Sequence, residues 1–214
     1  MKILFQGDSL TDSGRDKNTA QPNINLGMGY VNLLAARIIC DNPSVSVYNR
    51  GVSGNRICDM YARWIEDTLN IDFDILSILN GINDIGFEIR MGQGADKDKY
   101  KFVYDRMLFE AKEKRPDSKL VILEPFLVRK YIGEDGGDIY NDWDLWHAQI
   151  TECGEICREL ADKYHAVFVP LAEDFAKLSE KFGADVWSMD CIHPTAAGHE
   201  VIARKWMQCC KDIL

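Results

Sequence analysis

The sequence of 214 residues has no Cys-x-x-Cys pair, and its seven cysteines are scattered along the chain. An odd, dispersed set of this kind argues against both a zinc site and a disulfide framework, and is typical of reduced thiols in a cytoplasmic protein. The apolar run that follows Met1 is too short for a signal peptide, and no stretch approaches the length of a membrane span. We therefore expect a cytoplasmic protein that does not act in a membrane.

Basic residues are also scarce. Lys and Arg number 25 against 34 Asp and Glu, which gives a formal net charge of −9. A nucleic-acid groove needs a basic face, so this balance argues against a nucleic-acid partner. With 46% hydrophobic residues the composition is ordinary for a globular protein, and the length suits a single domain over residues 1–214.

Five short β-rich runs alternate with longer amphipathic stretches. The predicted strands are Lys2–Gln6, Val45–Asn49, Asp74–Leu79, Lys119–Glu124 and Ala166–Pro170. The predicted helices are Tyr30–Ile39, Ile57–Leu69, Asp98–Lys114, Trp143–Tyr164, Ala172–Phe182 and Thr195–Ile213. This alternation predicts an α/β fold with a mainly parallel sheet covered by helices on both faces.

Apolar spacing within the helices predicts which side chains face the core. The inward set of the first helix is Leu33, Leu34, Ala36 and Ile38, and that of the second is Ile57, Met60, Tyr61, Trp64, Ile65 and Leu69. Trp206 is expected to be a core residue of the last helix. The irregular stretch 131–141 is rich in Gly and Asp and predicts a loop, either a lid or a plain surface loop.

Polar residues follow each of the first three predicted strands. The stretches are Gly7-Asp8-Ser9, residues 49–55 and residues 80–84. In an open α/β sheet, ligands bind beyond the carboxyl ends of the strands, so these stretches are expected to share one rim. For Ser9 a purely structural interpretation also exists, because Ser9-x-x-Asp12 has the pattern of a helix capping box.

Asp190 and His193 stand three residues apart, just before the last predicted helix. On a turn, this spacing brings a carboxylate to an imidazole, where it fixes the histidine tautomer and stabilises the imidazolium formed when the ring takes a proton. His147 and His165 lie in helical patterns, and His199 is expected to pack or to make a supporting hydrogen bond. A metal site of Asp190, His193 and His199 is not favoured, because it lacks further clustered ligands.

Together these residues fit nucleophilic acyl transfer. Ser9 needs a base, because its hydroxyl is a poor nucleophile at neutral pH. His193 can supply that base, and Asp190 can orient it. The backbone N–H groups of Ser9 and Gly54 and the side chain of Asn83 are candidate donors to the developing oxyanion.

Four stretches resemble the sequence blocks of the SGNH (GDSL-type) hydrolases: Gly7-Asp8-Ser9-Leu10, Gly54, Gly81-Ile82-Asn83-Asp84 and Asp190-x-x-His193. They occur in the family's order, so the resemblance covers nearly the whole chain, whereas the G-x-S-x-G elbow of α/β-hydrolases is absent. The resemblance implies a flavodoxin-like three-layer α/β/α sandwich with a five-stranded, mainly parallel sheet. It also implies a serine hydrolase that needs no metal and no cofactor, in which Asp84 supports the loop of Asn83.

Within that family the chain is most similar to bacterial acetylxylan esterases and related carbohydrate acetylesterases. The similar stretches are residues 8–15, 26–31, 51–55, 62–64 and 193–199. The resemblance implies an acetylated oligosaccharide or another small ester as substrate, and a homo-oligomer, since relatives of this size often associate. Two features depart from those enzymes: Arg56 stands where they tend to have a small polar residue, and residues 131–146 have no recognisable counterpart. The natural substrate therefore stays open.

Four further residues are candidate substrate contacts: Asp8, Arg15, Arg56 and Trp187. Asp8 is expected to shape its turn rather than react, and Arg15 either faces the pocket or pairs with Asp12. Trp187 either lines the acyl pocket, where its size would favour acetyl, or packs in the core. Two alternative functions stay open: a lysophospholipase or thioesterase that uses the same residues on longer acyl chains, and a non-catalytic flavodoxin-like domain whose loops hold an anion.

Overall fold

Five parallel strands form one sheet in the order β2-β1-β3-β4-β5, which is the flavodoxin-like order. The computed structural model describes residues 1–18, 21–129 and 142–214, so the loop predicted at 131–141 lies outside the described residues. The strands are β1 (Lys2–Gly7), β2 (Ser46–Asn49), β3 (Ile75–Leu79), β4 (Lys119–Leu123) and β5 (Val167–Val169). Each agrees with its predicted range to within one residue at either end, which confirms the predicted sheet.

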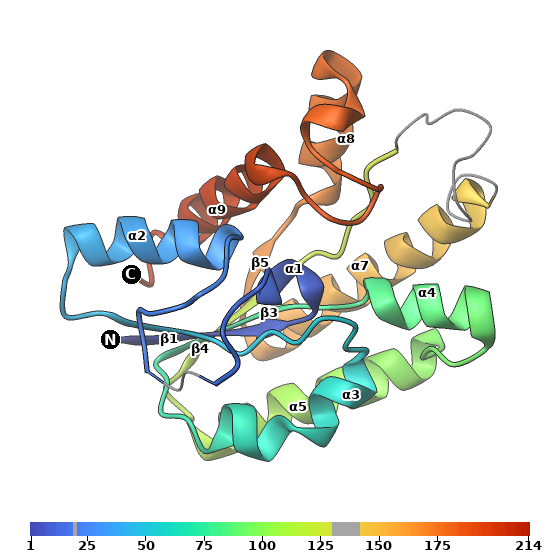
Figure 1. Ribbon diagram of the computed structural model, residues 1–214. Coiled ribbons are helices and arrows are strands. Elements are labelled where there is room, and N and C mark those ends of the chain that lie inside the picture. Colours follow the sequence, from blue (N-terminus) through green and yellow to red (C-terminus); the bar gives the residue numbers. More distant parts are fainter. Residues whose placement is uncertain (19–20, 130–141) are drawn as a thin grey trace.

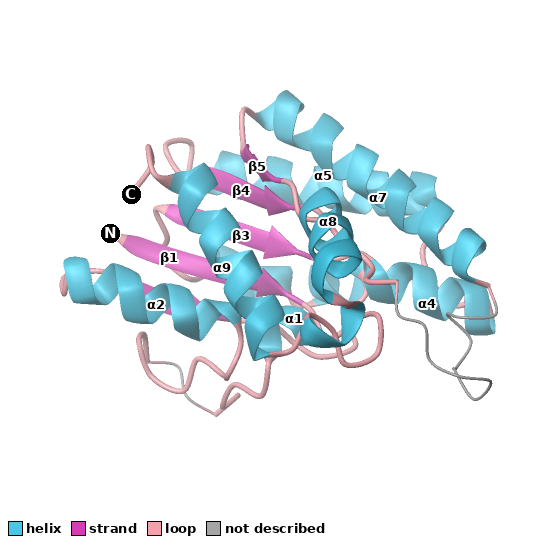
Figure 2. Cartoon of the chain, turned by 90° about the horizontal axis from the view of Figure 1, so that it is seen from above, coloured by secondary structure: helices cyan, strands magenta, loops and turns pink. Residues whose placement is uncertain are grey.

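Helices cover both faces of the sheet and make three layers (Figure 1). One face carries α2 (Tyr30–Asp41), α8 (Ala172–Phe182) and α9 (Ala196–Cys210); the other carries α3 (Ile57–Ala62), α5 (Lys97–Lys114) and α7 (Trp143–Tyr164). Figure 2 looks onto the sheet from the side of α9, with α5 and α7 behind it. Every residue of β3 is buried, as expected of a central parallel strand that is covered on both sides.

Two short helices and one longer one begin close to strand ends or loops and were not predicted from the sequence pattern. They are α1 (Ser9–Asp12), the 3-10 turn η2 (Ala184–Val186) and α4 (Ile82–Met91). The stretch 80–84 is therefore only in part a loop, because Gly81 precedes the first turn of α4. This helix begins directly after β3 and presents Asn83 at the rim of the sheet.

The predicted helix Ile57–Leu69 is interrupted. The α-helix ends at Ala62, and a π-helix, η1, follows over Ile65–Leu69. The wider π turn changes the angular spacing of the side chains from Ile65 onward, and Ile65 is 67% exposed. Tyr61, which lies in the last turn of α3, is 37% exposed. Their predicted place in the core is therefore wrong, whereas Trp64 is fully buried as expected.

The core of the first layer is built around Phe5 of β1 and Trp206 of α9, whose rings lie 5.6 Å apart and are both fully buried. The Trp206 indole N–H donates to the Ser77 hydroxyl of β3 at 3.0 Å, so the buried ring has its polar partner. In α2, Ala35 is buried and Ala36 is exposed, which reverses the prediction for Ala36. Across the described residues, no helix is long and apolar enough to cross a membrane.

Candidate active site

Ser9 is the first residue of α1 and follows β1 after a single residue. That residue, Asp8, is the cap of the helix: its side chain accepts the N–H of Leu10 at 3.0 Å and is 1% exposed. A capping box made by Ser9 and Asp12 is therefore wrong. Ser9 keeps its hydroxyl for another partner and stays partly exposed at the rim.

The turn before Ser9 depends on Gly7. Its φ of 155° and its close approach to β3 leave no room for a side chain, because a Cβ atom would lie 2.3 Å from the carbonyl oxygen of Leu79. The glycine lets β1 end tightly against β3. As a result, the nucleophile candidate sits directly over the carboxyl ends of the two central strands.

The hydroxyl of Ser9 lies 3.0 Å from Nε2 of His193. Nδ1 of the same ring lies 2.7 Å from a carboxylate oxygen of Asp190. A carboxylate can only accept, so the Nδ1 proton donates to Asp190 and Nε2 keeps the lone pair that accepts from Ser9. The three side chains form one hydrogen-bonded series that can take a proton from the serine hydroxyl.

The turn that carries Asp190 and His193 is built by the carboxylate itself. One oxygen of Asp190 accepts the backbone N–H groups of Ile192 and His193 at 3.1 and 2.7 Å, which leaves the other oxygen facing the imidazole. Cys191 has a positive φ of 72° within this turn, and its carbonyl accepts the N–H of Val128 at 2.9 Å. The segment after β4 therefore holds the turn in place.

These contacts change the acidity of both partners. Burial alone would raise the pKa of Asp190, but hydrogen bonds from the side chain and backbone of His193 outweigh it and hold that pKa at about 2. The hydrogen bond to Asp190 raises the pKa of His193 above its ordinary value, and the nearby Asp8 acts in the same direction. Burial raises the pKa of Asp8 itself to about 7. An ionised Asp190 can thus stabilise the imidazolium.

Hydrogen bonds join the three loops that follow β1, β2 and β3. The Val52 N–H donates to the Gly7 carbonyl at 3.0 Å, and the amides of Asn80 and Asn83 both donate to the Asn55 carbonyl, at 3.0 and 3.2 Å. Asn83 is thereby held beside the loop of Gly54. Gly54 has a positive φ of 82° with open space where a side chain would lie, so its backbone can be approached closely.

Asp84 and Arg63 hold the loops that follow β1, β2 and β3 in place through hydrogen bonds. The buried Asp84 carboxyl accepts the Ile57 N–H at 3.0 and 3.1 Å, which is the loop support predicted for it. Arg63 donates to the Asn55 side chain at 2.6 Å and to the Gly7 carbonyl at 3.3 Å. Sequence reasoning missed the role of Arg63, although a lone basic residue inside the apolar spacing of residues 57–69 was a usable signal.

Arg15 does not face the site. Its guanidinium donates to the Gly51 carbonyl at 2.6 Å, and the side chain is buried. The guanidinium does not form the predicted ion pair with Asp12. The Asp12 carboxylate instead lies 3.3 Å from the ammonium group of Lys17 and accepts the N–H and the hydroxyl of Ser53, both at 2.9 Å. Arg15 and Asp12 thus connect the loops after β1 and β2.

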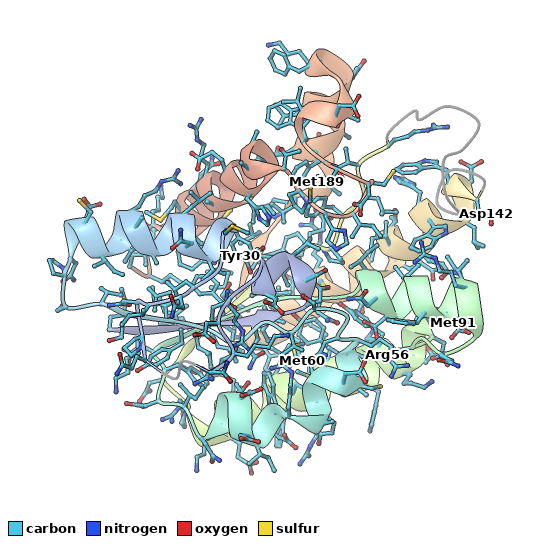
Figure 3. The ribbon with its side chains drawn as sticks, in the orientation of Figure 1. Tyr30, Arg56, Met60, Met91, Asp142 and Met189 are labelled. Atoms are coloured by element: carbon cyan, nitrogen blue, oxygen red, sulfur yellow. The ribbon has the colours of Figure 1, made fainter. Side chains whose placement is uncertain are left out.

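Arg56 and Trp187 also have structural partners. Arg56 binds Asp59 at 2.7 Å and lies over the ring of Phe87 at 5.5 Å, between α3 and α4 (Figure 3). Trp187 lies in the groove between α8 and α9, with its ring edge-on to Phe182 at 6.1 Å. Trp187 is not among the residues that line the cavity beside Asn83.

That cavity has a volume of about 70 Å³ and is lined by residues of α4 and α7 and of the turn before His193. Its lining consists of Ile82, Asn83, Gly86, Phe87, Arg90, Met91, Trp146 and Ile192. Trp146 and Phe87 are therefore the large aromatic residues next to the candidate oxyanion donor. Neither residue could be identified from the sequence pattern, because the wall is assembled from separate helices.

His199 makes the supporting hydrogen bonds predicted for it. Its Nδ1 accepts the N–H of Tyr30 at 3.2 Å, so the ring proton is on Nε2, which lies 3.4 Å from the Ser13 hydroxyl. Burial lowers the pKa of His199 to about 4, and the ring is neutral at physiological pH. His199 therefore connects α9 to the residue that ends α1. Within the described part of the chain, no three His, Cys, Asp or Glu side chains are grouped so as to hold a metal ion.

Comparison with known proteins shows which proteins the chain resembles in sequence and fold. The model of the GDSL-like lipase/acylhydrolase family matches residues 5–201. An acetylxylan esterase of Geobacillus stearothermophilus is 28% identical over 212 residues, which are 97% of this chain and 92% of that protein. The crystal structure of Axe2, an acetylxylan esterase from the same organism, superposes with a TM-score of 0.83 at 26% identity and the same coverage. A protein of Parabacteroides merdae described as a GDSL-like lipase reaches a TM-score of 0.88 at 32% identity, over 97% of this chain and 94% of that one.

Proposed function

Because the chain belongs to the GDSL-like lipase/acylhydrolase family and is a carboxylic ester hydrolase, we propose that it removes acetyl groups from xylan-derived or related oligosaccharides. The observation that carries the proposal is the hydrogen-bonded series of Ser9, His193 and Asp190 at the rim of the sheet. In this proposal the 214 residues form one catalytic domain.

In the first step, Ser9 Oγ attacks the carbonyl carbon of the ester while its proton moves to Nε2 of His193. The tetrahedral intermediate collapses, the bond to the alcohol oxygen breaks, and the imidazolium returns the proton to the leaving alcohol. The product is an acyl-enzyme on Ser9 and a free sugar hydroxyl. Asp190 keeps the required tautomer and stabilises the imidazolium without itself becoming protonated.

In the second step, water attacks the acyl carbon and gives its proton to His193. The second tetrahedral intermediate expels Ser9 Oγ, which takes that proton back, and the carboxylic acid is released. In both intermediates the oxyanion accepts from the N–H groups of Ser9 and Gly54 and from the amide of Asn83. The hydrogen bonds that tie these loops support this assignment, since preorganised donors need no reorganisation during the reaction.

The small cavity beside Asn83 supports a short acyl group. Its volume of about 70 Å³ gives room for a small group such as acetyl beside the candidate oxyanion donor, and little room for a long acyl chain within the cavity itself. This favours the acetylesterase over the alternative of a lysophospholipase or thioesterase.

The test is a series of 4-nitrophenyl esters from acetate to decanoate, measured with the wild type and Ser9→Ala. We expect the highest kcat/KM on acetate and loss of activity in the variant, followed by acetate release from acetylated xylo-oligosaccharides. A maximum at longer chains would replace the acetylesterase by the long-chain alternative. Equal rates for both proteins would mean that Ser9 is not the nucleophile and would favour the non-catalytic, anion-binding alternative. The cytoplasmic location and the homo-oligomer stay predictions.

A further inference from the structure

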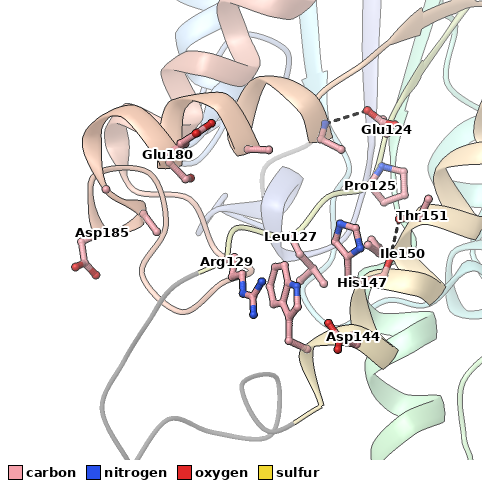
Figure 4. A pocket seen from close by; sticks show the side chains of 16 residues that line it. Glu124, Pro125, Leu127, Arg129, Asp144, His147, Ile150, Thr151, Glu180 and Asp185 are labelled. Carbon is pink, nitrogen blue, oxygen red and sulfur yellow. Dashed lines mark hydrogen bonds between the residues drawn. The ribbon is translucent and has the colours of Figure 1, made fainter.

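A second, larger cavity of about 820 Å³ opens between α7 and α8, at the carboxyl ends of β4 and β5 (Figure 4). We call it the α7–α8 cleft. Ligand-binding clefts commonly have volumes of about 300–1,000 Å³ and lie at this end of an open α/β sheet. Its size and position therefore suit a ligand, although none of the candidate catalytic residues lines it.

One wall of the cleft also supports the candidate active site. Pro125 and Leu127 line the cleft, and Val128 donates its N–H to the carbonyl of Cys191, in the turn between Asp190 and His193. Pro125 also lies against Gly81, two residues before Asn83. The segment after β4 thus has the cleft on one side and the catalytic turn and oxyanion loop on the other.

The first turns of α7 contribute to both spaces. Trp146 lines the small cavity beside Asn83, whereas Trp143 and His147, on either side of it in the sequence, line the cleft. On the other side of the cleft, the Ala184 carbonyl accepts the N–H groups of Trp187 and Ser188, which precede Asp190 in the sequence. The cleft is therefore a neighbour of the candidate active site, because α7 and the segment after β4 contribute to both.

The cleft has the chemistry of a sugar site rather than of an acyl trough. Its base is apolar, with Leu127 and Ile150, while the exposed lining carries Arg129, Asp144 and Glu180. Carboxylates accept from hydroxyl groups and a guanidinium donates to them, so this lining can pair with a polyol. An acyl chain would gain nothing from these groups and would desolvate them at a cost.

The aromatic residue of the cleft is held in place. The guanidinium of Arg129 lies over the Trp143 ring at 5.4 Å, and the ring of His147 lies 5.6 Å from it at an interplanar angle of 28°. Figure 4 shows the side chains of Arg129 and His147 on the same side of the cleft. These two contacts hold the indole in place, so its side chain loses little entropy when a ligand binds beside it.

We propose that the α7–α8 cleft binds the sugar units that flank the acetylated one, so that the enzyme prefers acetylated oligosaccharides to acetylated monosaccharides. This inference rests on the proposed function. A tenfold difference in kcat/KM corresponds to about 1.4 kcal/mol, which is within the range of one or two net hydrogen bonds. The expected preference for acetylated xylotriose over acetylated xylose is therefore roughly tenfold or more.

The experiment fills the cleft from its two walls. Ala176→Trp acts from α8 and Thr151→Trp from α7; both positions are exposed and line the cleft. Lys181→Trp is the matched control, because Lys181 is an exposed residue of α8 that does not line the cleft. For each protein, kcat/KM is measured on acetylated xylose, acetylated xylotriose and 4-nitrophenyl acetate. Each of the three substitutions is also made in the Ser9→Ala protein, and the binding of unacetylated xylotriose to these double variants is measured by calorimetry.

We expect both cleft variants to lose the preference for xylotriose and the heat of binding, while the control keeps both. Activity on 4-nitrophenyl acetate reports that a variant is folded. If the wild type acts on acetylated sugars but shows no length preference, or if both filled variants keep it, the cleft does not bind sugar and the acetylesterase stands. If the wild type cleaves 4-nitrophenyl acetate and no acetylated sugar, the proposed substrate class is wrong, and the cleft inference with it.

Discussion

The pair of asparagines that share one acceptor allows catalysis and structure to be separated. Asn80 and Asn83 both donate to the Asn55 carbonyl, at 3.0 and 3.2 Å. An amide nitrogen carries two hydrogens, so Asn83 has a second one to donate to an oxyanion. If Asn83 only supported the Asn55 loop, replacing either asparagine by alanine would have a similar effect.

The expected magnitudes differ widely. Losing one hydrogen bond to the Asn55 carbonyl costs about 0.5–1.5 kcal/mol of stability, and in each variant the other asparagine still satisfies that carbonyl. Losing an oxyanion donor costs about 2.7–4 kcal/mol in the transition state, or about 10²–10³ in kcat. We therefore expect Asn83→Ala to lower kcat by about 10²–10³ with KM little changed, and Asn80→Ala to lower it by less than about tenfold.

The assay is the steady-state hydrolysis of 4-nitrophenyl acetate, with thermal melting of both variants to compare their stability. Melting temperatures should fall by similar amounts in the two proteins. Equal losses of kcat in Asn80→Ala and Asn83→Ala would refute the oxyanion role of Asn83 and leave it a residue that positions the loop.

Three further predictions concern acidity, orientation and acyl size. In Asp190→Asn, the backbone N–H groups of Ile192 and His193 should bind the amide oxygen of the new side chain, as they now bind one carboxylate oxygen. The NH₂ group of the asparagine then faces Nδ1 of His193, which must accept, so the ring proton moves to Nε2. We expect kcat to fall about 10⁴-fold, and any remaining activity to have its acid limb at lower pH, since Asp190 raises the pKa of His193; an unchanged pH profile would contradict this. Burial raises the pKa of Asp84 to about 8, so the folded protein loses stability as pH rises from about 4, where the unfolded carboxyl titrates, to about 8. Asp84→Asn should therefore melt above the wild type at pH 8, by a margin that shrinks toward pH 5, and a margin independent of pH would argue against a buried carboxyl. Phe87→Ala should widen the small cavity and raise activity on butyrate relative to acetate, whereas Trp187→Ala, in the α8–α9 groove, should leave that ratio unchanged; the reverse result would place the acyl group against Trp187.

The sequence was sufficient for the sheet because each strand is a short apolar run bounded by turn residues. It failed within Ile57–Leu69, since nothing in the apolar spacing marks where an α-helix ends at Ala62 and a π turn follows. It also left α4 unassigned, because Gly81, just before its first turn, makes the start of the helix resemble an ordinary turn.

For the site, the motif spacing was sufficient to find the residues that the structure joins in one hydrogen-bonded series. Ser9 and His193 lie far apart in the sequence, yet each stands at the end of a predictable element, so the topology brings them to one rim. The residues that shape the binding spaces could not be found in this way. Trp146 lines its cavity only because α7 packs against α4, and Trp187 lies in a groove that depends on the packing of α8 against α9.

The most direct test of the central claim is the covalent labelling of Ser9 by a 4-nitrophenyl phosphonate ester. We expect the intact mass of the wild type to increase by one phosphonyl group, which peptide mapping assigns to Ser9. Labelling should be absent in Ser9→Ala and far slower in His193→Ala. A wild type that takes up no label, or a Ser9→Ala protein that labels at the wild-type rate, would contradict the account.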